Sequence, residues 1–217
     1  MVKDCGTERR LTMSVPDKSI DPRLLQSAKE VFLDKGFEMA QLSEICKKAG
    51  VTTGALYKRF AGKEELFCAI VKDTIEAMEG YVERIETADL STYTDQQIYE
   101  GFHMDPDANI HWLKFLYDHK EGFTLLIKCS SGTRYGDFHD KWPERMTAIH
   151  YKFYLEAKRR GMAKKELTED EMNVYTSAIW VMFYKPFLLD LPWESMEKIA
   201  YALSEFVNWY AVLGIEK

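Results

Sequence analysis

Residues 41–60, which read QLSEICKKAGVTTGALYKRF, contain two short helical patterns joined by a turn. In the first, Leu42 and Ile45 recur at the spacing of a half-buried helix. Gly50 follows, and glycine best tolerates the left-handed backbone at a helix C-terminus. Thr52 is then a candidate N-cap for the second helix. A helix, a short glycine-containing turn and a polar second helix predict a helix-turn-helix.

The second helix carries side chains that suit DNA. Its first turn offers hydroxyls and backbone N–H groups to a phosphate, and its small residues leave room for a close approach to a major groove. Between residues 41 and 63 there are five Lys or Arg residues and one acid, Glu44, so the net charge is 5 − 1 = +4, against −6 for the whole chain. The candidate DNA-binding residues are Gln41, Thr52, Thr53, Gly54, Ala55, Tyr57, Lys58, Arg59 and Lys63.

A packed pair of helices with a solvated basic edge would produce the same pattern. The longer run GFEMAQLSEICKKAGVTTGALYKRFAGKEELF, residues 36–67, is more specific, and it resembles the N-terminal domain of TetR/AcrR-type transcriptional regulators. The matching features are Gly36-Phe37, Ile45, Ala49-Gly50-Val51, Thr52, Gly54, Leu56-Tyr57, Phe60, Lys63-Glu64 and Leu66. The chain departs from the family at Ala40 and Gly62, where hydroxyl residues that could touch phosphate are usual.

Composition and charge distribution agree with a regulator that touches DNA at one end. Residues 1–65 contain 12 basic and 10 acidic residues, net +2, whereas the remainder contains 17 and 25, net −8. A small basic unit on an acidic body fits local rather than extended contact with nucleic acid. No apolar run approaches the ~20 residues of a membrane span, and residues 1–17 resemble a flexible arm rather than a secretion signal. We expect a cytoplasmic protein.

The rest of the chain is helical in pattern, so we predict an all-α fold. Asp21-Pro22 should open the first helix with Asp21 as its N-cap. An uninterrupted stripe predicts a fourth helix from Lys63 to about Glu86, a mechanical link between domains. Further helices are expected near 91–102, 105–117, 123–129, 135–160, 168–186, where Pro186 should kink or stop the helix, and 194–213. The expected domains are residues 18–78 for DNA binding and 79–217 for ligand binding and dimerisation.

The family resemblance implies a homodimer, formed through the last two helices, that binds a palindromic operator. It also implies an effector site in the body, which would make the protein a repressor relieved by a small molecule. Aromatic walls with a few polar groups describe such a pocket, although they equally describe a core. The candidate pocket residues are Trp112, Phe115, Phe123, Trp142, His150, Tyr154 and Trp180.

We expect no enzyme activity, metal or cofactor. Glu100 and His103 have the spacing of a carboxylate metal motif, but the second motif and further ligands that such sites require are not evident. No nucleotide-binding or nucleophile motif occurs. The remaining alternatives are a helical small-molecule-binding protein or a protein-interaction module, neither of which would bind duplex DNA.

Overall fold

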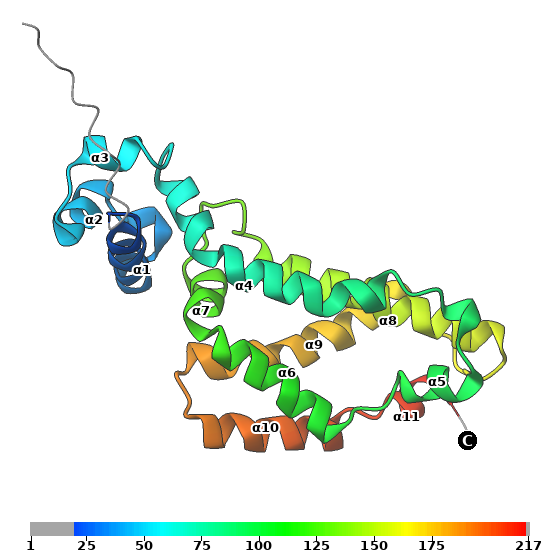
Figure 1. The fold of residues 1–217 in the computed structure, drawn as a ribbon. Coiled ribbons are helices and arrows are strands. Elements are labelled where there is room, and N and C mark those ends of the chain that lie inside the picture. The colour runs from blue at the N-terminus through cyan, green and yellow to red at the C-terminus, as the bar shows by residue number, and fades with distance from the viewer. Residues whose placement is uncertain (1–19, 216–217) are drawn as a thin grey trace, which may run out of the picture.

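The computed structural model describes residues 20–215, which fold almost entirely into helices. Within this range the only extended pairing is a single antiparallel bridge between Ala163 and Ile215. The all-α prediction is therefore confirmed. Figure 1 shows a small three-helix unit at one end of the molecule, from which α4 runs along a larger helical body. We call the three-helix unit the head.

The head contains α1 (Ile20–Met39), α2 (Leu42–Ala49) and α3 (Thr53–Tyr57). Gly50 ends α2 with φ of 66°, as its position predicted. Asp21 is not the N-cap of α1, because the helix begins one residue earlier, at Ile20. Asp21 instead lies in the first turn, where an acidic side chain favours the helix dipole, and its carboxylate pairs with Arg59 of the α3–α4 connection.

Three phenylalanines form the centre of the head. The rings of Phe32, Phe37 and Phe67 lie with centroids 5.3 to 5.8 Å apart. Phe67 belongs to α4, so the first turns of α4 are part of the head core as well as the start of the body. Because two short helices bury too little apolar surface to stand alone, α1 and α4 hold the helix-turn-helix in place.

The fourth helix, α4, runs from Lys63 to Glu86 without a break, as predicted. Leu66 and Phe67 are buried in the head, whereas Met78 and Val82 are buried in the body. A single rigid element thus contacts both parts of the molecule.

The body is built on two helix starts that the sequence identified. Asp105 caps α6 by accepting a hydrogen bond from Asp107 N at 3.0 Å, and Thr168 with Glu171 forms a capping box on α9. The helices of the body are η1 (Leu90–Thr92), α5 (Asp95–Glu100), α6 (Pro106–Asp118), α7 (Lys120–Lys128), α8 (Phe138–Arg159), α9 (Glu169–Leu188), α10 (Trp193–Phe206) and α11 (Trp209–Leu213).

Three boundaries differ from the prediction. The last helix is two helices, because Val207 is extended (φ −103°, ψ 108°) and Asn208 caps α11 through Ala211 N at 3.0 Å. Pro186 does not stop α9, which continues to Leu188. The segment near 91–102 divides into η1 and α5, because the Asp89 and Thr94 side chains each cap a separate turn.

Helix α7 joins the head to the body. The backbone N–H of Phe37 donates to Cys129 O just beyond α7 at 3.1 Å, and Lys29 of α1 pairs with Glu121 at 2.5 Å. On its other side, buried Gly122 packs directly on Thr74 of α4. The position of α7 therefore affects the angle at which α1 and α4 carry the helix-turn-helix.

Candidate nucleic-acid interface and effector cavity

The outer face of the helix-turn-helix is formed by α3 and the turn before it. Leu56 is fully buried and anchors α3, while Thr53, Gly54 and Lys58 are exposed and Tyr57 is 58% exposed. The remaining candidates Gln41 and Thr52 are exposed as well, and Ala55 is partly exposed. These seven predicted residues are thus exposed or partly exposed. We call the surface formed by Thr52, Thr53, Gly54, Ala55, Tyr57 and Lys58 the α3 surface.

Several of these residues also have structural roles. The Thr52 hydroxyl accepts a hydrogen bond from Ala55 N at 3.1 Å, so Thr52 is the N-cap that the sequence predicted. Arg59 pairs with Asp21 and donates to Ala55 O at 3.0 Å. These contacts fix the short α3, whose five residues would not form a stable helix alone.

Lys63 is held by the head itself. Its Nζ donates to Glu38 O and to Ala40 O, both at 3.0 Å, and lies 4.5 Å from the Phe37 ring centroid. The ammonium therefore binds the carbonyls that end α1, a favourable position for a cation. With Lys48 paired to Glu30 at 2.6 Å, the positive charge at the α3 surface is smaller than residue counting indicated.

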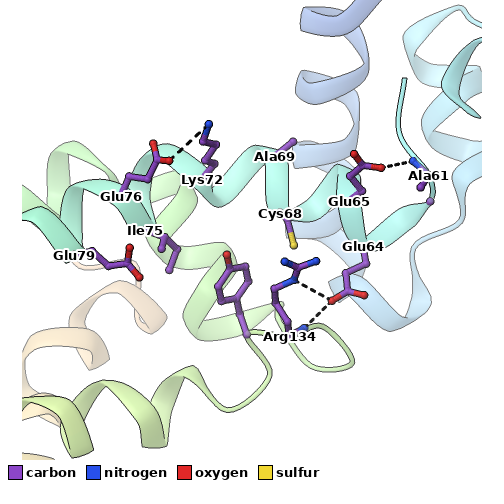
Figure 2. Close-up of a pocket in the computed structure, with 12 residues that line it drawn as sticks. Ala61, Glu64, Glu65, Cys68, Ala69, Lys72, Ile75, Glu76, Glu79 and Arg134 are labelled. Atoms are coloured by element: carbon purple, nitrogen blue, oxygen red, sulfur yellow. Dashed lines mark hydrogen bonds and ion pairs between the residues drawn. The ribbon is translucent and has the colours of Figure 1, made fainter. Parts of the chain in front are cut away.

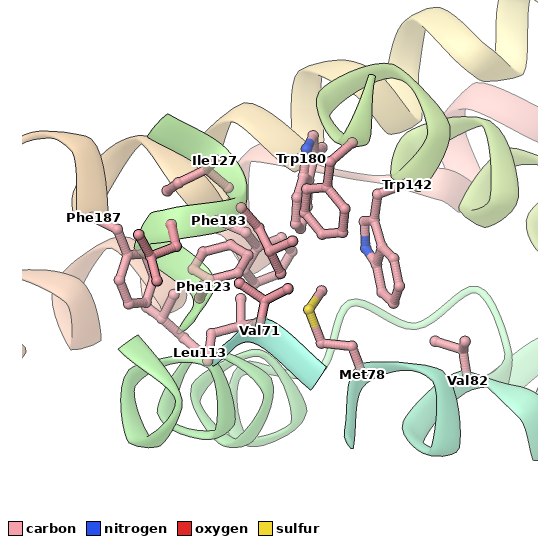
Figure 3. Packing of buried hydrophobic residues seen from close by; sticks show 14 of the residues in the cluster. Val71, Met78, Val82, Leu113, Phe123, Ile127, Trp142, Trp180, Phe183 and Phe187 are labelled. Atoms are coloured by element: carbon pink, nitrogen blue, oxygen red, sulfur yellow. The ribbon is translucent and has the colours of Figure 1, made fainter. Parts of the chain in front are cut away.

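An apolar cavity of about 210 Å³ lies in the body. Four of its aromatic side chains come from α6, α8 and α9: Trp112, Trp142, Trp180 and Phe183. Trp142 and Trp180 lie next to one another beside Met78 of α4, with ring centroids 6.0 Å apart (Figure 3).

Four of the seven predicted pocket residues line this cavity, namely Trp112, Trp142, His150 and Trp180. The other three lie outside it. Phe123 is buried in the core edge-on to Trp180, Phe115 stacks on the far side of Trp112 with Tyr81, and the Tyr154 hydroxyl accepts from Leu167 N at 3.0 Å.

Sequence reasoning missed the part of the cavity that α4 contributes. Tyr81 and Val82 of α4 line it, together with Met104, Ala108, Asn109, Met146, Thr176 and Ile179. Tyr81 is 39% exposed, so this wall reaches the surface. The signal was present in the unbroken apolar stripe of α4, but such a stripe does not say which of its residues face a space rather than another side chain.

The polar groups of the cavity are few. Thr176 Oγ1 is satisfied by Met172 O at 3.1 Å and by Thr147. His150 Nδ1 lies 2.7 Å from Met146 O, so Nδ1 carries the proton and Nε2 carries the lone pair. Burial lowers the pKa of His150 below its ordinary 6.5, which keeps the ring neutral at pH 7.

A larger groove of about 860 Å³ runs along the head end of α4, and it is charged rather than apolar. Three of its four carboxylates have partners: Glu64 accepts from Arg134 N at 3.0 Å, Glu65 accepts from Ala61 N, and a Glu76 carboxylate oxygen lies 3.7 Å from Lys72 Nζ (Figure 2). We regard the apolar cavity as the better ligand site, because the groove is a solvated surface on which most of the charges already pair within the chain.

Two further observations limit the class of protein. Within residues 20–215, no three or more His, Cys, Asp or Glu side chains are grouped to hold a metal ion. None of the helices in that range combines the length and apolar character that crossing a membrane requires.

The head exposes the polar second helix of its helix-turn-helix, and one long helix joins the head to a body that contains a cavity. This arrangement defines a helix-turn-helix DNA-binding regulator.

Comparison with known proteins agrees. Residues 24–70 match the family of bacterial regulatory proteins named after tetR. The HTH-type regulator YvdT of Bacillus subtilis, itself uncharacterized, is 28% identical over 71% of this chain and 73% of its own length. UidR of Escherichia coli K12 is 35% identical, over 35% of this chain and 39% of its own length.

Solved structures share the fold. NalD of Pseudomonas aeruginosa aligns with a TM-score of 0.57 at 20% identity, over 86% of this chain and 93% of its own. A TetR/AcrR-type regulator of Aquifex aeolicus also aligns with a TM-score of 0.57. It is 16% identical, and the alignment covers 87% of this chain and 99% of the Aquifex chain. Residues 24–70 thus form a TetR-type DNA-binding domain, and the chain is a DNA-binding transcriptional regulator. The relatives that it matches are transcriptional regulators, not enzymes. The alternatives without DNA binding are not supported.

Proposed function

We propose that this protein is a homodimeric repressor that binds a palindromic operator through the α3 surface and releases it when a small molecule occupies the cavity. The observation that carries the proposal is the exposure of Thr53, Gly54, Tyr57 and Lys58 on one face of a helix whose opposite face is anchored by Leu56. Residues 18–78, which include the head, would read DNA, and residues 79–217 would bind ligand and partner. NalD, which shares the fold, is a repressor, the secondary repressor of the MexAB-OprM multidrug efflux pump.

Each exposed residue has an assigned role in this proposal. Tyr57 and Lys58 bind phosphates, which orient the protein on the duplex without reading sequence. Thr53, Gly54 and Ala55 approach the base edges, where small side chains permit close contact. Gln41, at the start of α2, contacts the backbone beside the groove. Thr52 and Arg59 chiefly position α3 through Ala55, and Lys63 holds the end of α1.

The second subunit would pack on the last two long helices, α9 and α10. Both carry apolar residues that remain exposed in the single chain: Val174 and Val181 on α9, and Tyr201 and Phe206 on α10. Clusters of this kind usually mark an interaction surface. A two-fold dimer would place two α3 surfaces in successive major grooves about 34 Å apart.

Coupling between cavity and DNA would run through α4 and α7. Tyr81 and Val82 of α4 line the cavity, and Phe123 of α7 packs on Trp180 of the cavity wall at 5.9 Å. A ligand that prefers one arrangement of these helices shifts the population of head orientations by its differential affinity. DNA binding also places the protein where the chromosome is, so we propose a cytoplasmic location.

The test is binding to fluorescent duplexes that contain the palindromes flanking the coding region, at two salt concentrations. We expect one palindrome to bind two subunits tightly, with an affinity that falls steeply as salt rises. Lys58→Ala should weaken binding and lower the salt slope by about 2, because each of the two subunits loses one phosphate contact. The matched control is Lys72→Ala, an exposed lysine of α4 outside the α3 surface. Equal affinity for palindromic and scrambled duplexes would contradict operator recognition by this head.

A further inference from the structure

The chemistry of the cavity narrows the class of its ligand, an inference that rests on the proposed effector function. The lining contains no Asp, Glu, Lys or Arg side chain within the part of the chain described by the structure. Its one titratable ring of basic character, His150, is kept neutral by burial. An ionised ligand group would have to leave water without an opposite charge to meet it, which is strongly unfavourable.

Two donors in the cavity wall have no partner. Asn109 Nδ2 and Trp180 Nε1 are buried and make no hydrogen bond within residues 20–215. Asn109 is only 7% exposed and Trp180 only 5%. A buried donor without an acceptor is uncommon and costly. The indole N–H is the more informative of the two, because it can only donate.

Size and shape limit the ligand further. A cavity of about 150 Å³ accepts benzene, so about 210 Å³ suits a molecule of about two fused rings. The indoles of Trp112 and Trp142 lie nearly parallel, with 6° between their planes, and flat walls favour a flat ligand. Met104 and Met146 are flexible fillers at the edges, which adapt to its outline.

We propose that the cavity binds an uncharged, flat, aromatic or similarly apolar molecule that carries a hydrogen-bond acceptor, such as a carbonyl oxygen, placed to accept from Trp180 Nε1. The lining offers no charged partner to a carboxylate or an ammonium group, so we expect organic acids and amines to bind more weakly than a neutral molecule of the same shape.

The test uses four probes on one naphthalene scaffold: 2-acetylnaphthalene, 2-isopropylnaphthalene, 2-naphthoate and 2-naphthylmethylammonium. Isothermal titration calorimetry on the full-length protein gives the dissociation constants. We expect 2-acetylnaphthalene to bind at least tenfold more tightly than either charged probe, because only the neutral probe enters without an unpaired charge. Tighter or equal binding of either ion would overturn the proposal, as would failure of all four probes to bind.

A double-mutant cycle isolates the hydrogen bond. Trp180→Phe keeps a flat apolar wall but removes the donor, so the preference for the acetyl over the isopropyl probe should fall about three- to tenfold. Trp193→Phe is the matched control, because Trp193 of α10 packs on Tyr117 outside the cavity. An unchanged preference in Trp180→Phe would refute the assigned contact.

A third variant locates the binding. Ala108 is an exposed lining residue at the mouth, so Ala108→Trp should block entry, weaken 2-acetylnaphthalene at least tenfold and leave the fold intact. Undiminished binding would place the ligand elsewhere and overturn the proposal. The same probe added to the protein–operator complex tests the effector function separately. If binding follows the expected pattern but DNA is retained, the ligand class stands and the coupling proposed above fails.

Discussion

At the scale of single residues, Gly54 offers the sharpest test of how closely α3 approaches DNA. A Cβ atom built on Gly54 meets only Thr52 Oγ1, at 3.9 Å, so the protein itself does not require glycine there. Gly54→Ala should leave stability unchanged or raise it by up to about 1 kcal/mol, because alanine favours a helix. It should nevertheless weaken operator binding at least tenfold, since the added methyl group would face the groove.

The two measurements for Gly54→Ala are thermal unfolding and operator affinity by fluorescence anisotropy. Gly80→Ala is the matched control, because Gly80 is an exposed glycine of α4 with open space around its Cβ position. It should show the same gain in stability and no change in affinity. Wild-type affinity for Gly54→Ala would mean that α3 does not approach the bases closely at this position.

Substitutions of Lys63 and Lys58 distinguish a lysine that stabilises the head from a lysine that binds DNA. Lys63 Nζ donates to Glu38 O and Ala40 O, so Lys63→Ala should destabilise the chain by about 1 kcal/mol and lower Tm by about 2–4 °C. Lys58 is exposed, so Lys58→Ala should leave Tm unchanged. Circular dichroism melts of both variants check this. An unchanged Tm in Lys63→Ala would return Lys63 to its predicted role as a phosphate ligand.

Residue roles were only partly readable from the sequence. The caps Gly50 and Thr52 were predicted correctly, because capping depends on a few consecutive residues. The engagement of Lys63 was not, because its partners lie 23 and 25 positions away in the chain. Counting charges along a segment therefore overestimated the cations available to DNA. Only the tertiary contacts distinguish an exposed lysine from one whose ammonium group binds the carbonyls at the end of a helix.

At the scale of elements, the packing of α7 on α4 controls how the head is carried. A Cβ atom on Gly122 would lie 2.0 Å from Thr74 Oγ1, closer than any real contact. Gly122→Ala should therefore force α7 away from α4 and destabilise the protein by about 1–3 kcal/mol, as overpacking does. Because α7 also binds the head through Cys129 O and Phe37 N, operator affinity should change as well.

Thermal melts and operator titrations of Gly122→Ala and of Gly122→Ala/Thr74→Ala test this coupling. Thr74→Ala removes both the hydroxyl and the Cγ2 methyl group, so only the Cβ of residue 74 stays near the new methyl group, at 3.0 Å. The double variant should recover part of both stability and affinity. If stability recovers while affinity never changed, α7 does not control the head.

Element boundaries were predictable where a side chain caps a helix and unpredictable where tertiary packing decides. Asp105 and Thr168 start α6 and α9 as expected. The break between α10 and α11 has no proline or glycine to announce it. Trp209 is almost fully buried, and the chain leaves the helical path at Val207, so burial of this indole accompanies the break. Likewise, a helix was expected near residues 123–129, but the contact of α7 with the head was not.

At the scale of the whole molecule, acid stability should depend on one ion-pair cluster. Hydrogen bonds from Arg159 and then Arg160 lower the pKa of Glu156 from 4.5 to about 2. Arg160 also donates to Tyr93 O and Leu90 O, which ties α8 to the start of the body. A carboxylate with a depressed pKa in the folded state stabilises fully above pH about 4.5 and loses this contribution as pH falls toward 2.

Glu156→Gln should thus lower Tm at pH 6 and flatten the decline of Tm between pH 5 and pH 2. The matched control is Glu166→Gln, which removes a carboxylate whose side chain is 86% exposed and should leave the profile of the wild type. Parallel profiles for wild type and Glu156→Gln would show that the cluster does not set acid stability.

Dimerisation decides whether two heads can bind one palindrome. The proposed dimer interface on α9 and α10 can be tested with substitutions that do not disturb the core. Val181 of α9 is 42% exposed, so Val181→Glu should fold normally but bury a charge in the proposed interface, which strongly opposes association. We expect monomers by analytical ultracentrifugation. Operator affinity should fall at least tenfold, because each head would bind its half-site alone. Leu155→Glu on α8, at an exposed position outside the last two helices, should remain dimeric. The reverse result would move the interface from α9 and α10 to α8.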